Sequence, residues 1–227
     1  MKNIRNMLVV LVAMAALTNP LSAFEGLSFG GVYSMATFDT SGSETEGGTA
    51  NESDQHEKTS TTISKDVDYA SYFAEYTFSQ GSTIGIEVIP GEAELGTRSR
   101  TEAASADDSD DGTPTAKAEV SDHITLYVEP TWMMSETFGV YVKGGVSKVD
   151  IKTKESLPSA STYGDVTVYG QMTGFGAKTY LGNWFAKLEY VETDYGDISI
   201  TSTTGNRNTV QASPDQEATR IALGYNF

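Results

Sequence analysis

The chain has 227 residues, no cysteine and a formal net charge of −16, from 31 acidic and 15 basic residues. Without cysteine, disulfides, thiolate chemistry and cysteine-linked lipid attachment are excluded. The acidic excess argues against a nucleic-acid partner, because a phosphate-binding protein needs the opposite charge.

The N-terminal segment predicts a secretory signal peptide. Lys2 and Arg5 precede an apolar stretch at 7–17, and small residues follow, ending at Ala23. A retained membrane anchor is the alternative, but it would need about 20 apolar residues. We therefore expect residues 1–23 to be removed and the mature chain to begin near Phe24.

The rest of the chain contains eight segments in which apolar and small or polar residues alternate with a period of two, the pattern of a strand with two different faces. In chain order they are residues 27–38, 67–78, 83–88, 123–132, 138–147, 166–180, 184–190 and 219–227. The sixth is the least regular; there we place Phe175 outward and Lys178 inward. Such strands have a bland average hydropathy even when one face meets lipid.

The connections between these strands alternate in length. Those after the second, fourth and sixth strands are only a few residues long, whereas residues 39–66, 91–119, 150–163 and 194–216 form long polar links. This sorting puts every short turn at one rim, as in outer-membrane barrels, whereas a soluble sandwich has no reason to sort its loops. The fold class predicted is all-β: an eight-stranded antiparallel up-and-down transmembrane β-barrel over residues 24–227, with four long extracellular loops.

Aromatic side chains gather at the short-turn ends of the predicted strands. Such rings settle at the boundary between bilayer and water. The predicted periplasmic belt comprises Phe29, Phe78, Trp132, Phe138 and Trp184, with Tyr225 and Phe227 at the C-terminus.

Charged residues of both signs fall at inward positions a few residues from the short-turn rim. They are Glu75, Glu87, Glu129, Lys143, Lys178, Lys187, Glu189 and Arg220. A barrel of eight strands has an interior only wide enough for side chains to fill, and buried charges are tolerable only when paired. We expect a layer of four carboxylates and four cations that closes the lumen, with Arg220 pairing a glutamate such as Glu75 or Glu129. A narrow ion path is the alternative.

One acidic segment invites a calcium interpretation. Counting from Asp107, Gly112 occupies the sixth position of an EF-hand loop, but the twelfth is Ala118, where a bidentate glutamate is required. The segment therefore fits a solvated acidic loop better than an EF-hand. Loose binding of divalent cations by this loop is the alternative. We predict no metal site and no cofactor.

Enzymatic chemistry would need a nucleophile beside a base. The only histidines are His56 and His123, and Ser121 shares the inward face with His123, with Asp122 opposite. The lipid A deacylase barrels have His-x-Ser on one strand face, whereas Thr125 stands two residues after His123. We expect no enzyme activity.

The last strand ends Gly224-Tyr225-Asn226-Phe227, with Ile221 and Leu223 on the same face as the two aromatic residues. With the signal peptide and the strand layout, this end resembles the small outer-membrane barrels of the OmpA-transmembrane, OmpX and opacity-protein type, often described as porin family. The resemblance implies that Ile221, Leu223, Tyr225 and Phe227 form a signal for the outer-membrane assembly machinery.

It also implies a monomer in outer-membrane lipid and lipopolysaccharide of a Gram-negative cell envelope. The function expected is non-enzymatic, contributing to envelope integrity and presenting acidic loops. The alternatives are a narrow porin-like channel and a loop-mediated adhesin or phage receptor.

Overall fold

The computed structural model describes residues 25–45, 58–99, 115–156, 163–203 and 209–227, and all its regular elements are strands. Among these residues, no helix is long and apolar enough to cross a bilayer. The strands are β1 (Gly26–Thr45), β2 (Lys58–Thr77), β3 (Thr83–Ile89), β4 (Ala93–Ser99), β5 (Thr115–Glu129), β6 (Thr131–Met133), β7 (Phe138–Ser156), β8 (Val166–Leu181), β9 (Trp184–Tyr195), β10 (Ile198–Thr201) and β11 (Thr209–Asn226).

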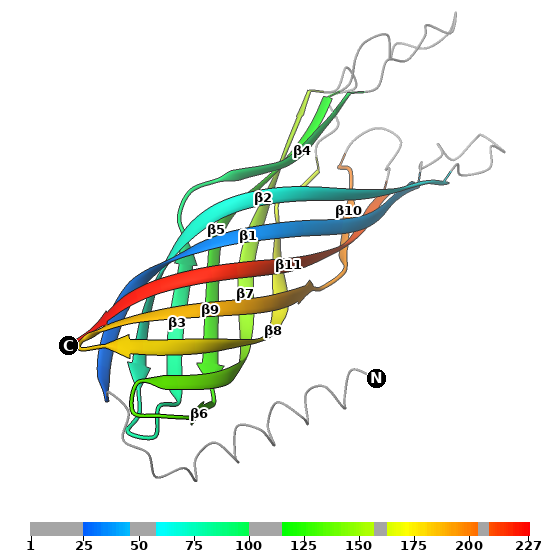
Figure 1. Cartoon of the computed structure of the whole chain (residues 1–227). Helices are drawn as coiled ribbons and strands as arrows, with labels where there is room; N and C mark the ends of the chain where they lie inside the picture. The colour runs from blue at the N-terminus through cyan, green and yellow to red at the C-terminus, as the bar shows by residue number, and fades with distance from the viewer. Residues whose placement is uncertain (1–24, 46–57, 100–114, 157–162, 204–208) are drawn as a thin grey trace, which may run out of the picture.

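The strands close into one antiparallel barrel (Figure 1). Its order is β1-β2-β3-β5-β7-β8-β9-β11, and β11 returns to pair with β1 from Ser28↔Asn226 to Thr45↔Thr209. β4, β6 and β10 follow β3, β5 and β9 after short interruptions, two of which contain Pro90 and Pro130, residues that cannot donate to a ladder. The eight-stranded antiparallel barrel predicted from the sequence is therefore confirmed.

The two faces of the barrel wall differ as the alternation predicts. Lys178, on the least regular predicted strand, is 1% exposed, whereas its outward neighbour Phe175 is 62% exposed. Outward apolar side chains form what we call the apolar band, with 37–65% of each side chain exposed. The band comprises Leu27, Phe29, Tyr33, Met35, Tyr72, Tyr76, Ile84, Ile86, Val88, Ile124, Leu126, Val128, Phe138, Val140, Val146, Phe175, Leu188, Ile221 and Leu223.

Three short turns lie at the end of the barrel that holds the C-terminus (Figure 1). Gly81, with a φ of 87°, closes the turn between β2 and β3, where the Phe78 amide donates to the Ser82 carbonyl at 2.8 Å. Gly182, with a φ of 59°, turns β8 into β9. Positive φ is strained for most other residues, which explains the two glycines.

At the opposite end, the strands run well into the predicted long loops, so the predicted strand bounds are too short. β1 continues to Thr45, β2 begins at Lys58, and β7 continues to Ser156. The outer strand extensions of β1 and β2 are rich in serine and threonine, and every side chain of β2 from Ser60 to Asp66 is exposed, so both of its faces meet water there. The apolar alternation used for prediction is absent in these two extensions, although threonine still favours extended backbone.

Inside the barrel, apolar clusters lie on either side of the charged residues. The cluster nearest the short turns contains Val32, Phe73, Met133, Tyr180, Phe185 and Ala222. The cluster at the outer mouth contains Val149, Ile151, Val168 and Tyr195. The charged residues thus occupy the middle of a filled lumen.

Candidate functional site

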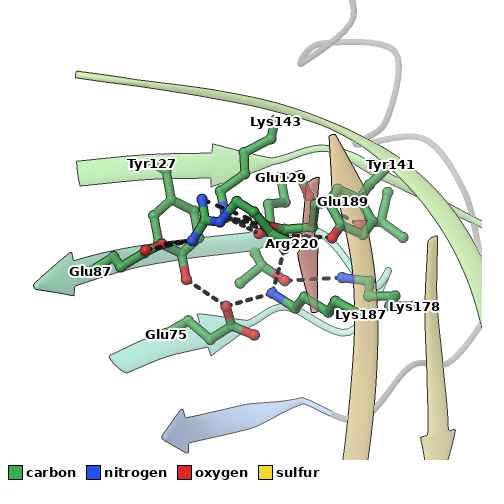
Figure 2. Close-up of polar contacts among 12 residues, drawn as sticks. Glu75, Glu87, Tyr127, Glu129, Tyr141, Lys143, Lys178, Lys187, Glu189 and Arg220 are labelled. Atoms are coloured by element: carbon green, nitrogen blue, oxygen red, sulfur yellow. Dashed lines mark hydrogen bonds and ion pairs between the residues drawn. The ribbon is translucent and has the colours of Figure 1, made fainter. Parts of the chain in front are cut away.

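The structure places all eight predicted lumen charges inside the barrel. Their exposed fractions run from 0% to 4%, and Figure 2 shows most of them converging in one network. They come from β2, β3, β5, β7, β8, β9 and β11, so the network ties together most of the wall.

Glu129 lies at the centre of the network and is fully buried. Its two carboxylate oxygens meet different lysines, Lys187 at 2.7 Å and Lys143 at 3.1 Å. Lys187 also meets Glu75 at 2.7 Å, and Lys143 meets Glu189 at 3.1 Å. Each lysine therefore bridges two carboxylates, an arrangement that compensates the cost of removing these charges from water.

Arg220 pairs with carboxylates other than the predicted Glu75 and Glu129, so that prediction is wrong. Its guanidinium donates to both oxygens of Glu87 and lies 3.7 Å from Glu189. Glu189 is the residue directly opposite Arg220 on the neighbouring strand. Side-chain parity showed which residues face inward, but not how the tilted strands are staggered, and the stagger decides which charges meet.

Lys178 also departs from the prediction of four paired cations. Its ammonium group donates to the Gly81 carbonyl at 2.7 Å and to the Thr83 hydroxyl at 3.1 Å, both neutral oxygens. It is directly opposite Lys187 on the next strand. Within the described part of the chain, the ion-pair network thus contains four glutamates and three cations, and Lys178 binds the turn between β2 and β3 instead.

Hydroxyl donors complete the network, and the sequence analysis missed them. Tyr127 donates to Glu75 and Tyr141 to Glu189, each at 2.7 Å, and Ser71 donates to Glu87 at 2.6 Å. Both tyrosines are at inward positions of their strands, and a buried tyrosine hydroxyl needs a hydrogen-bond partner. Their position in the sequence could therefore have predicted that they donate to the lumen carboxylates.

Glycines make room for the large rings that fill the lumen. Each of five inward aromatic residues is directly opposite a glycine on the adjacent strand, where a Cβ would collide with the ring. The pairs are Phe73–Gly30, Tyr127–Gly85, Tyr141–Gly176, Phe185–Gly224 and Tyr195–Gly170. A side chain at Gly85 or Gly176 would displace the ring of Tyr127 or Tyr141, and with it the hydroxyl that donates to Glu75 or Glu189.

Above the network, a chain of hydrogen bonds crosses the lumen. His123 Nε2 lies 3.0 Å from the Tyr195 hydroxyl, which donates to Gln216 at 3.1 Å, and Gln216 in turn donates to Tyr69. His123, Gln216 and Tyr69, together with Arg220 and Glu87, line a cavity of about 10 Å³, room for about one water molecule.

His123, the histidine that could serve as a base, is hydrogen-bonded to Tyr195 and not to the nearby Ser121. The Ser121 hydroxyl donates to Asp122 at 3.5 Å, and no hydrogen bond among the described residues joins Ser121 to His123. A β-bulge, with Asp122 at a φ of 52°, separates the two. His56 and the acidic segment 107–112 lie outside the described residues. Within the described ranges, no group of three or more His, Asp or Glu residues is arranged to hold a metal ion.

The aromatic residues at the short-turn end contact one another. Phe227 meets Phe29 and Tyr225 edge-on at 5.8 and 4.9 Å between ring centroids, and Trp184 meets Tyr225 at 5.1 Å. Phe78 and Phe138 are also exposed, and Trp132 is half-buried. This arrangement suits a belt of aromatic residues at a membrane boundary, and the position of the belt at the periplasmic boundary remains a prediction.

The closed barrel, its outward apolar band and its short turns at one end give the chain the fold of the small outer-membrane β-barrels. Outer membrane protein OprG from Pseudomonas aeruginosa is similar in structure, with a TM-score of 0.51, 13% sequence identity, and coverage of 91% of this chain and 100% of that one.

Two further solved structures align with lower scores. Outer membrane protease OmpT from Escherichia coli has a TM-score of 0.42 and 9% identity over 90% of this chain and 97% of that one. Neisserial surface protein A has a TM-score of 0.43 and 9% identity over 85% of this chain and 97% of that one. No protein-family model and no curated protein matches the sequence.

Proposed function

We propose that the protein is a non-enzymatic outer-membrane barrel with a closed lumen, which contributes to envelope integrity and presents an acidic outer surface. The apolar band supports a position in lipid, because an isolated water-soluble barrel would expose these side chains to water. The fold shared with OprG supports the outer membrane as its location.

The buried ion-pair network is the observation that carries this proposal. Glu129, Lys143 and Lys187 meet in the middle of the lumen with almost no solvent exposure. Apolar clusters lie on both sides of them. An ion crossing the barrel would have to separate the charge pairs and move rings on both sides, so we expect no open path.

Recordings from purified full-length protein in planar bilayers test the closed lumen. We expect no discrete conductance steps from the native protein. A variant combining Glu129→Ala and Lys187→Ala, which removes one carboxylate and one cation together, serves as the positive control. We expect it to conduct ions, and that conductance would show that the barrel inserts into the bilayer under the conditions used. Stable steps from the native protein would refute the closed lumen and favour the narrow channel.

Assembly forms a second part of the proposal. We infer that residues 1–23 direct export and are removed, and that Ile221, Leu223, Tyr225 and Phe227 are read by the assembly machinery. Ile221, Leu223 and Tyr225 face outward on β11, and Phe227, the residue after its end, is exposed as well, so another protein could contact all four before the barrel closes. The assembled protein is then a monomer surrounded by lipid and lipopolysaccharide.

Two changes on β11 separate the assembly signal from the lumen network. Deleting Phe227 should reduce the amount of folded, heat-modifiable protein in cells, while purified protein still refolds in detergent. Arg220→Met should reach the membrane but unfold more easily, because Glu87 loses its partner. If both variants behave alike in cells and in refolding, the distinction is wrong.

A further inference from the structure

One strand of the barrel has a long unpaired edge at the outer end. β2 pairs with β1 along its whole length, from Gly26↔Thr77 to Thr45↔Lys58. On its other side it pairs with β3 only from Tyr72↔Val88 to Thr77↔Thr83. Among the described residues, no strand pairs with this side of β2 over 58–71, and Figure 1 shows β2 and β4 diverging there.

This free edge is accessible. Every side chain from Ser60 to Asp66 is exposed, so neither face of this part of β2 is covered by described residues. The edge is more than twice as long as a usual strand of about 5–6 residues. An exposed edge of this kind offers a row of backbone donors and acceptors to an incoming strand.

The outward face beside the edge is acidic. Asp66 and Asp68 lie on β2 itself, and each accepts a hydrogen bond from β1, Thr37 to Asp66 at 2.8 Å and Tyr33 to Asp68 at 2.9 Å. These bonds hold the carboxylates in place from the side away from the edge. The acidic row continues across the adjacent strands with Asp39, Asp215, Glu217, Glu192 and Asp194.

The inward face of the same edge is different in character. Ile63 is 53% exposed although it lies beyond the apolar band, Val67 follows four residues later on the same face, and Lys65 lies between the two. A strand added to this edge would place alternate side chains beside carboxylates and beside aliphatic groups.

We propose that the free edge of β2, residues 58–71, binds an extended basic polypeptide segment by strand addition. Basic side chains of the segment lie beside Asp66 and Asp68, and the alternate apolar side chains lie beside Ile63 and Val67. The backbone bonds supply much of the affinity, and the alternating faces select the sequence. Access of such a segment to the edge from outside the cell rests on the proposed outer-membrane location. Binding of the segment to the purified protein in detergent does not.

A pair of peptides tests strand addition. The first alternates Lys and Val over about eight residues, a typical strand length; the second has the same sequence with alternate amides N-methylated, so it keeps its charge but cannot join a sheet. Binding to the full-length protein in micelles is measured by fluorescence anisotropy. Only the first should bind tightly and slow hydrogen exchange in residues 58–71. Equal binding of both peptides, or none by the first, would overturn the proposal.

Matched variants then separate the edge from general acidity. Asp66→Asn with Asp68→Asn removes two charges at the edge, and should weaken binding about tenfold, as expected for two exposed charge pairs. Glu192→Gln with Glu217→Gln removes two charges from the same acidic row on β9 and β11; Tyr190 donates to this pair much as Tyr33 donates to Asp68. This control should bind almost as well as the native protein. Equal losses in the two variants would mean diffuse charge attraction and would refute the site. Heat-modifiable migration checks folding of both.

Discussion

Ion pairs of nearly equal length occur in two different surroundings in this barrel. In the lumen, Lys187 meets Glu129 at 2.7 Å, with side chains at most 2% exposed. On the outer strand extensions, Lys148 meets Asp150 at 3.0 Å and Lys152 meets Glu92 at 2.9 Å, with side chains 29–52% exposed. The distances alone would rank these pairs together. Burial separates them, because a lumen charge that loses its partner cannot turn to water, whereas an outer charge can.

The largest effect should follow the loss of a shared cation in the lumen. Lys187→Met leaves Glu75 and Glu129 without their common partner. Breaking a buried pair of this kind costs about 3–5 kcal/mol. The free energy of unfolding, measured by urea titration in lipid vesicles, should fall by that amount.

The double variant Lys187→Met, Glu129→Gln provides the control for this prediction. It removes one uncompensated carboxylate along with the lysine, so part of the lost stability should return. A loss below about 1 kcal/mol for the single variant, the range of exposed pairs, would show that the lumen charges are solvated and that the two surroundings do not differ.

A smaller effect should follow overfilling of the lumen beside the network. At Gly85 an added Cβ would lie 2.5 Å from the ring of Tyr127 and 2.9 Å from Glu75 Cβ. Gly85→Ala should therefore destabilise the barrel by about 1–3 kcal/mol, the usual cost of overpacking. The same urea titration measures it.

A second glycine, Gly42 on the outer part of β1, provides the comparison for Gly85. There a Cβ would meet backbone oxygen at 3.2 Å and no ring. Gly42→Ala should cost clearly less than Gly85→Ala. Equal costs would mean that the close approach of Tyr127 is not what requires glycine at position 85.

Lys178 sharpens the comparison within the lumen itself. It is as buried as Lys187 and directly opposite it, but its ammonium group meets only the neutral oxygens of Gly81 and Thr83. Lys178→Met removes two hydrogen bonds and also a buried charge beside another lysine, so the two effects partly offset. We expect a loss of about 1 kcal/mol in the same urea titration. A loss as large as that of Lys187→Met would show that Lys178 belongs to the ion-pair network.

Most of the fold could be predicted from the sequence, because the alternation along each strand and the order of short and long connections can both be read directly along the chain. Inward parity also located the lumen charges, including Lys178 on the least regular strand. Which of the lumen charges pair with one another could not be predicted from the sequence. Arg220 meets Glu87 rather than Glu75 because of the stagger between tilted strands, a relation between segments far apart in the chain. The outer strand extensions of β1 and β2 were missed for a local reason, since their serine- and threonine-rich residues lack the apolar alternation that marks a strand.

The smallest effect should come from the outer pair. The Thr167 hydroxyl, and after it Lys148, donate to the Asp150 carboxylate and hold its pKa below the ordinary value. A depressed folded pKa stabilises the protein above the unfolded pKa, and that contribution disappears as the pH falls through the folded value. Because Asp150 is solvated, the unfolding midpoint should barely move over this range. An NMR titration of the Asp150 carboxyl carbon in micelles should instead show the shift directly, with Thr167→Val returning the pKa toward normal further than Lys148→Met does. If Lys148→Met had the larger effect, attraction between the charges would dominate this exposed site, and the outer pair would resemble the lumen network more closely than its burial allows.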